Sequence, residues 1–115
     1  MQYVLLAYAD DHPVAMPSSE REALEDACRT NDEALRKSGH LLAVEVLQSN
    51  CTATTVRFQQ GQLSITVGPL APTREQLTGI FTITARDLNE AIQVAATMPQ
   101  VRGGPIEVRP LVAFD

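Results

Sequence analysis

The sequence predicts an α+β fold in which two helices cover one face of an antiparallel sheet. Apolar stretches of strand length alternate with two stretches of helical periodicity, in the order strand, helix, strand, hairpin, strand, helix, strand. Hydrophobic residues make up 44% and charged residues 20% of the 115 residues, which is ordinary for a globular chain. There is no repeat, low-complexity segment or linker, so we expect a single domain over residues 1–115.

The first strand is expected at residues 2–9, because this apolar stretch has the length of a buried strand. A loop over residues 10–17 follows, and its two prolines exclude regular structure. Ser19-Glu20-Arg21-Glu22 has the form of a capping box, which predicts a helix from there to about Ser38. Gly39 is expected to end this helix in the left-handed conformation.

The second strand is expected at His40–Gln48, with Leu41 and Glu45 on the same face. In the next two stretches, Ala53–Gln59 and Gln62–Val67, residues alternate between two faces; in the first of them Thr54, Val56 and Phe58 alternate with Thr55, Arg57 and Gln59. They predict a β-hairpin whose turn uses the positive φ that Gly61 can adopt.

A rigid loop is expected at Gly68–Pro72. Thr73-Arg74-Glu75-Gln76 resembles a second capping box and predicts one short helical turn. The next strand is expected at Thr78–Ala85, where Gly79, Phe81 and Ile83 share one face of the sheet.

Asp87 is the expected N-cap of the second helix, which Pro99 ends. The last strand is expected at Ile106–Leu111. When the hairpin is set aside, the remaining order is βαββαβ. The fold class is therefore α+β, ferredoxin-like with an inserted β-hairpin.

Two helices can cover only one side of the sheet, and the other side carries both aliphatic and charged residues. Tyr8, Glu45, Glu107 and Arg109 are expected there. The simplest arrangement is a homodimer in which two sheets face each other and these residues line a shared cavity for a ligand. Alternatively, Glu107 and Arg109 form an ion pair without further function, and we favour that interpretation over a catalytic one.

The net charge of −5, from 9 basic and 14 acidic residues, argues against binding to nucleic acid or to an anionic membrane. No apolar stretch approaches the roughly 20 residues that span a bilayer, and the N-terminus lacks the basic region of an export signal. Cys28 and Cys51 are too few for a disulfide framework. We therefore expect reduced thiols and a cytoplasmic location.

His12 follows Asp10 and Asp11 and is a candidate general base, although an exposed loop histidine is the favoured interpretation. Consecutive side chains diverge, so we predict no metal site in this segment. The sequence lacks phosphate-binding and dinucleotide-binding motifs, and no cofactor is predicted. Arg57 and Arg74 are further candidates for binding an anionic group, against the simpler role of surface charge.

The stretch from Val67 to Gly79, VGPLAPTREQLTG, resembles the signature segment of the YCII-related family, in its Asp-Gly-Pro-Phe branch. Further matches extend through most of the chain and include Tyr3–Leu6, Thr52–Arg57, Asp87–Ala91 and Glu107–Pro110. The resemblance implies a ferredoxin-like homodimer of the dimeric α/β-barrel kind. One related member is thought to remove chloride from a chlorinated lactone, muconolactone isomerases share the architecture, and many members are encoded beside sigma factors.

This chain departs from the signature at two positions. The signature Asp is Val67 here and the Phe is Leu70, while Gly68-Pro69 is retained. A carboxylate can act as a general base or orient a histidine, and valine can do neither. The turn of the motif is therefore expected to remain, without its ionisable group.

These observations predict a small-molecule-binding protein of the YCII-like type, with a small organic acid or lactone between the sheets of a homodimer. The ligand-binding candidates are Tyr8, Glu45, Arg57, Glu107 and Arg109. One alternative is an isomerase or dehydrohalogenase that uses Glu45 or Glu107 as proton carrier. Another is a non-catalytic accessory protein in sigma-factor-linked regulation. Catalytic residues are left unassigned.

Overall fold

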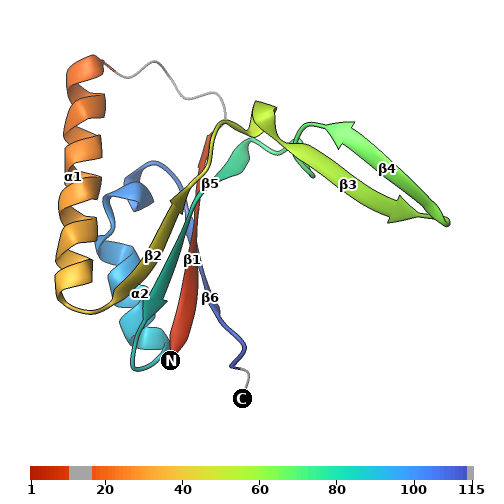
Figure 1. Cartoon of the computed structure of the whole chain (residues 1–115). Coiled ribbons are helices and arrows are strands. Elements are labelled where there is room, and N and C mark those ends of the chain that lie inside the picture. Colours follow the sequence, from red (N-terminus) through yellow and green to blue (C-terminus); the bar gives the residue numbers. More distant parts are fainter. Residues whose placement is uncertain (11–16, 114–115) are drawn as a thin grey trace.

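A computed structural model describes residues 1–10 and 17–113 of the chain. It has an α+β fold in which a four-stranded antiparallel sheet carries helices on one face (Figure 1). The sheet contains β1 (Gln2–Asp10), β2 (Leu41–Val46), β5 (Glu75–Thr84) and β6 (Ile106–Pro110). The remaining elements are α1 (Ser18–Lys37), α2 (Leu88–Thr97), strands β3 (Thr54–Gln59) and β4 (Gln62–Val67), and the short 3₁₀ turns η1 (Asn50–Thr52) and η2 (Pro99–Arg102).

The strand order is β2-β5-β1-β6, and every neighbouring pair is antiparallel. Strands β1 and β2, which α1 connects, are therefore not neighbours in the sheet, because β5 lies between them. This arrangement is consistent with the ferredoxin-like α+β fold that the order of elements predicts.

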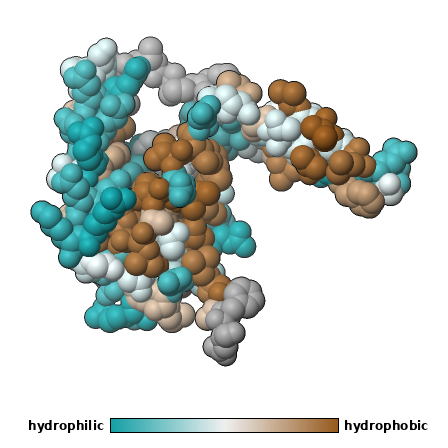
Figure 2. Space-filling model, in the orientation of Figure 1, coloured by the Kyte–Doolittle hydropathy of each residue, from teal (hydrophilic) through white to brown (hydrophobic). Residues whose placement is uncertain are grey.

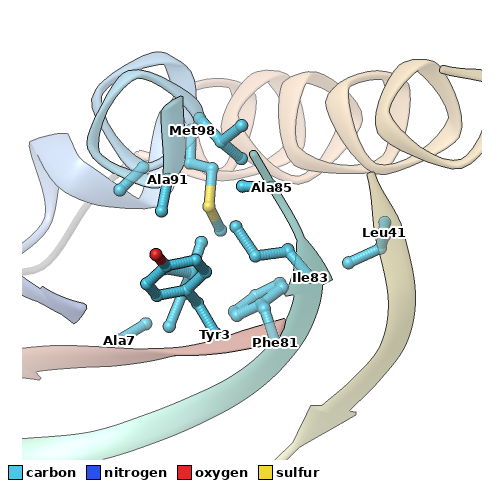
Figure 3. Close-up of a cluster of buried hydrophobic side chains, with 11 residues drawn as sticks. Tyr3, Ala7, Leu41, Phe81, Ile83, Ala85, Ala91 and Met98 are labelled. Carbon is cyan, nitrogen blue, oxygen red and sulfur yellow. The ribbon is translucent and has the colours of Figure 1, made fainter. Parts of the chain in front are cut away.

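The hydrophobic core lies between the sheet and α2. Alternate residues of β1 point into it, and Leu5 is completely buried there, as is Ile83 of β5 (Figure 3). Met98, at the end of α2, fills the space above them. Three more residues of α2 are buried, namely Ala91, Val94 and Ala95. Small side chains let this helix approach the sheet closely, so that α2 rather than α1 seals the core.

Helix α1 has a looser attachment than α2. None of its residues is buried, and only one stripe, which includes Leu24, Cys28 and Leu35, is half-buried. The expected capping box at Ser19 is wrong, because the helix already begins at Ser18 and Pro17 occupies the cap position without a side-chain hydrogen bond. A proline at this boundary has no N–H to satisfy, and its restricted φ suits the start of a helix.

The second helix begins as the sequence predicts. The Asp87 side chain accepts a hydrogen bond of 2.9 Å from the backbone N–H of Glu90. By contrast, the short helical turn expected at Thr73–Gln76 is wrong, because β5 already begins at Glu75 and pairs with Asp10 of β1. The Gln76 amide donates to the carbonyl oxygens of Ala71 and Thr73, which satisfies the loop without any helix.

The second strand also differs from strict alternation. Its pairing with β5 shifts between Leu41 and Ala43, so Leu41 joins the core while Glu45 points to the opposite face. The expectation that these two residues share a face is therefore wrong. A bulge adds one residue and exchanges the faces beyond it.

Strands β3 and β4 pair with each other and extend away from the body as an arm, which we define as residues 54–67. At its tip Gln60 and Gly61 both have positive φ, of 52° and 76°, as a two-residue hairpin turn requires. Figure 1 shows the arm projecting on the side opposite α1. The radius of gyration is accordingly 16.2 Å, against about 13 Å for a compact domain of this length.

Gly104 allows β6 to approach β1 closely, and this contact is testable. A Cβ at Gly104 would collide with the backbone carbonyl of Tyr8, whose N–H donates to the Pro105 carbonyl at 3.0 Å. Gly104→Ala is therefore expected to lower the free energy of unfolding by about 2–4 kcal/mol in denaturant titrations. Gly103→Ala is the matched control, since the nearest atom to its Cβ lies at an ordinary 3.6 Å. Equal losses in both variants would contradict this assignment.

Candidate functional site

The face of the sheet that points away from the helices, which we call the open face, is built from rows of residues that run across the four strands. One row contains Glu45, Ile80, Leu6 and Glu107, in the order of the strands. The next contains Ala43, Thr82, Val4 and Arg109. Each row thus has an uncharged centre and a charge on at least one edge strand. The central residues of both rows, on β1 and β5, are half-buried rather than fully exposed, although no helix covers them.

Tyr8, Glu107 and Arg109 come together at the β1–β6 side of the open face. The Tyr8 hydroxyl donates a hydrogen bond of 3.3 Å to Oε1 of Glu107. Burial raises the pKa of Tyr8 above its ordinary value, and the Glu107 carboxylate raises it further, while the positive charge of Arg109 opposes both. The phenol therefore stays protonated at neutral pH and can act as a hydrogen-bond donor.

The other sequence-predicted candidates lie elsewhere within one chain. Glu45 is on the edge strand β2, three strand spacings or about 14 Å from Glu107 on β6. Arg57 is on the arm, opposite Ser64, and is exposed. His12 lies outside the residues that the structure describes.

A concavity of about 850 Å³ lies where the sheet meets the base of the arm. Tyr8 and Leu77 come from the sheet, Leu47 and Asn50 from the connection after β2, and Val56 and Leu70 from the arm and the loop that follows it. Its lining is mostly apolar, with polar groups that include the Tyr8 and Asn50 side chains. This combination is typical of sites for small organic molecules.

Sequence reasoning placed Tyr8 near a ligand but missed the other walls of this concavity. The available signal was the Gly68-Pro69 turn, because Gly68 has a φ of 115° that favours glycine. Its N–H donates to the Ala53 carbonyl and its own carbonyl accepts from the Thr55 hydroxyl, both at 2.8 Å. These bonds fix the loop after the arm to the start of the arm and so close the base of the hairpin.

Arg74 is not available as an unpaired cation beside this concavity. Its Nε lies 2.7 Å from Oδ2 of Asp10. Because β5 begins at Glu75 where a helical turn was expected, no helix N-terminus lies beside Arg74 to help it bind an anion. The simpler role of a surface charge fits the observed ion pair better.

A second hollow, of about 470 Å³, separates α1 from the sheet. Cys28 and Asp32 line it from the helix, and Val44, Phe81 and Gln100 from the other side. Within the described part of the chain, Oδ1 of Asp32 and Oε1 of Gln100 are buried without a hydrogen-bond partner. Burial raises the pKa of Cys28 and that of Asp32. The Cys28 thiol is therefore poorly activated as a nucleophile.

Two other titratable side chains, those of His40 and Cys51, make contacts within the fold. His40 bridges Ser38 Oγ, at 2.7 Å from Nδ1, and Glu90 Oε1, at 3.2 Å from Nε2. Cys51 Sγ lies 3.2 Å from Ser49 Oγ. Over residues 1–10 and 17–113, no three His, Cys, Asp or Glu side chains converge as a metal site would require. Neither helix in that part of the chain is long and apolar enough to cross a membrane.

Comparison with known proteins gives two findings. The sequence matches the YCII-related domain over residues 1–115. An uncharacterised protein of Rhizobium meliloti (strain 1021) is 32% identical over 119 residues, an alignment that covers 99% of this chain and 94% of the relative.

The buried carboxyl of Asp32 gives a prediction on stability. Because its pKa is raised, the folded state holds this proton more tightly than the unfolded state. The free energy of unfolding therefore falls as pH rises from the unfolded pKa, near 3.9, through the folded pKa. Asp32→Asn has no charge to desolvate and is expected to raise Tm by roughly 1–4 °C at pH 7.

The gain from Asp32→Asn should shrink as the pH is lowered towards 4, as measured by thermal unfolding across that range. Asp26→Asn is the control on the same helix, because the Asp26 side chain is 69% exposed and pairs with Arg29. A gain for Asp32→Asn that is independent of pH would contradict the desolvation argument.

Proposed function

Since the chain belongs to the YCII-related family, we propose that it is a small-molecule-binding protein that acts as a homodimer. Two sheets face each other through their open faces, as in a dimeric α/β barrel, and the ligand lies between them. The ligand is a small organic acid or lactone. The arm is the hairpin inserted into the ferredoxin-like order of strands.

The observation that carries the dimer is the excess of exposed surface. One chain exposes 8392 Å², whereas a compact monomer of 12.5 kDa exposes roughly 6,200 Å². The excess of about 2,200 Å² per chain is of the size that obligate dimers bury. Part of it is apolar: Phe58 and Val67 of the arm are each more than 70% exposed. Monomeric proteins seldom leave so much apolar surface in water.

The chemistry of the ligand follows from groups on the open face and in the concavity. Arg109, on strand β6 of the open face, supplies a cation that suits a carboxylate or a lactone carbonyl. Leu47 and Leu77 offer apolar surface for a carbon skeleton. Glu107 holds the Tyr8 hydroxyl in place through the 3.3 Å hydrogen bond.

Binding is favoured over the proton-transfer alternative. At the position where the family signature has Asp, this chain has Val67. The concavity in turn favours a ligand-binding role over an accessory protein that binds no metabolite.

The first test of this proposal is assembly. We expect two chains per particle in sedimentation at micromolar concentration. Ile80→Lys should raise the dimer dissociation constant by at least about 100-fold, since it brings charges into the centre of the interface. The chain itself can tolerate this lysine, because Glu45 lies opposite Ile80 in the ladder. Ile92→Lys, at a 47% exposed position of α2, is the control and should remain dimeric. A wild-type monomer at 100 micromolar would refute the proposal.

The second test is binding. A thermal-shift screen of small carboxylic acids and lactones is expected to find compounds that raise Tm, because a ligand at 100 times its Kd stabilises by about 2.7 kcal/mol. Arg109→Ala should abolish the shift for the acids. Arg102→Ala removes an exposed cation of η2 and should leave it unchanged. The ligand proposal fails if no compound shifts Tm, or if Arg109→Ala has no effect on the shift.

A further inference from the structure

We infer that the arm clasps a second copy of this chain, and that this partner chain forms the roof of the concavity. This inference rests on the homodimer proposed above and adds a role for the arm. Each ligand site then needs two chains to be complete, with the apolar face of the arm in contact with the partner.

The two faces of the arm differ sharply in chemistry. Cross-strand partners lie on the same face, so Val56 with Ile65 and Phe58 with Leu63 form one apolar face, which Val67 continues. The other face is polar throughout and carries the pairs Thr55–Thr66, Arg57–Ser64 and Gln59–Gln62. Such alternation is typical of strands with one covered and one solvated face.

Nothing in the described chain covers the apolar face. Phe58 is 74% and Leu63 64% exposed, and both strands pair only with each other there. A two-stranded hairpin without support is marginally stable in water. The arm is nevertheless regular, with six paired positions along its length. Contact with an additional surface that buries the apolar face would explain why the arm is regular although it carries exposed apolar side chains.

The direction of the arm indicates that its apolar face contacts the same chain that covers the open face. Val56, on the apolar face of the arm, and Tyr8 and Leu77, on the sheet, line the same concavity. The arm and the open face are therefore two walls of one recess, and Figure 2 shows hydrophobic surface over both. A second chain that packs on the open face fills this recess, contacts the arm and covers the concavity at the corner of the recess.

A second copy fits the recess better than an unrelated partner. The excess of about 2,200 Å² per chain is of the size that a large symmetric interface buries, and the open face and the arm are apolar surfaces available for it. In a two-fold dimer the same two surfaces are used by both chains, so each arm embraces the other body. One contact thus covers both apolar surfaces of both chains.

The decisive experiment is a photocross-link from the arm. Phe58→p-benzoylphenylalanine is introduced, and this chain is mixed with isotopically labelled unmodified chain before irradiation. We expect a cross-link to the labelled partner, mapped by mass spectrometry to its open face or to the lining of its concavity. A cross-link confined to its own chain, or the absence of any cross-link in a sample that sediments as a dimer, would overturn the clasp while leaving the sheet-to-sheet dimer intact.

Charge substitutions provide a matched comparison. Phe58→Glu with Leu63→Glu alters one cross-strand pair of the apolar face, and Gln59→Glu with Gln62→Glu alters the adjacent pair on the polar face. The apolar pair should raise the dimer dissociation constant at least about 100-fold, and the polar pair by less than about 3-fold. Both sites are exposed in the single chain, so thermal unfolding of the body should remain cooperative in each variant.

The outcomes separate the two proposals. If the apolar-pair variant stays dimeric while Ile80→Lys dissociates, the arm inference is wrong and the sheet-to-sheet dimer stands. If the apolar-pair variant dissociates while Ile80→Lys stays dimeric, the arm holds the chains together and the open face does not. If the wild-type chain is a monomer, both fail.

Discussion

The central strand β1 is the element on which the rest of the structure depends. It is hydrogen-bonded on both sides, to β5 and β6, and its alternating residues serve two different surfaces. Tyr3, Leu5 and Ala7 are buried under α2, whereas Val4, Leu6 and Tyr8 form the middle of the open face. A shift of register by one residue would exchange these two sets. The close approach at Gly104 and the bond from Tyr8 to Pro105 help to fix that register, and with it the position of the Tyr8 hydroxyl near Glu107.

Alternation in the sequence was sufficient to predict which residues of β1, β5 and β6 share a face, because period-two patterns report burial directly. It failed at Leu41, where a shift in pairing inserts a residue, and at Thr73–Gln76, where side chains that can cap a helix bond to a loop instead. The concavity could not be predicted either. Its walls come from the sheet, the connection after β2, the arm and the loop after the arm, and the way these segments meet leaves no periodic signal in the sequence.

The concavity at the arm and the hollow beneath α1 differ in what surrounds them. The hollow beneath α1 exists because no residue of this helix is buried. The helix therefore lies over the sheet without closing the space between them. The unpaired Asp32 and Gln100 oxygens reduce the stability of the chain itself. The concavity at the arm has its polar Tyr8 group satisfied by Glu107 and is otherwise mostly apolar. It can therefore remain available to a ligand with little cost to the fold, which is why we place the proposed function there.

The arm also gives a physical reason for the valine at position 67, where the Asp-Gly-Pro-Phe signature that this stretch resembles has aspartate. Val67 is the last residue of β4, lies opposite Thr54 and is 83% exposed, and it extends the apolar strip formed by Val56 and Ile65. In the proposed dimer an aspartate at this position would carry a charge into the contact between chains, where it would need a partner to offset its desolvation. Valine instead adds apolar area to that contact. In the proposed dimer Val67 therefore contributes apolar contact between the chains and offers no group that could move a proton, which fits a binding protein better than an acid–base catalyst.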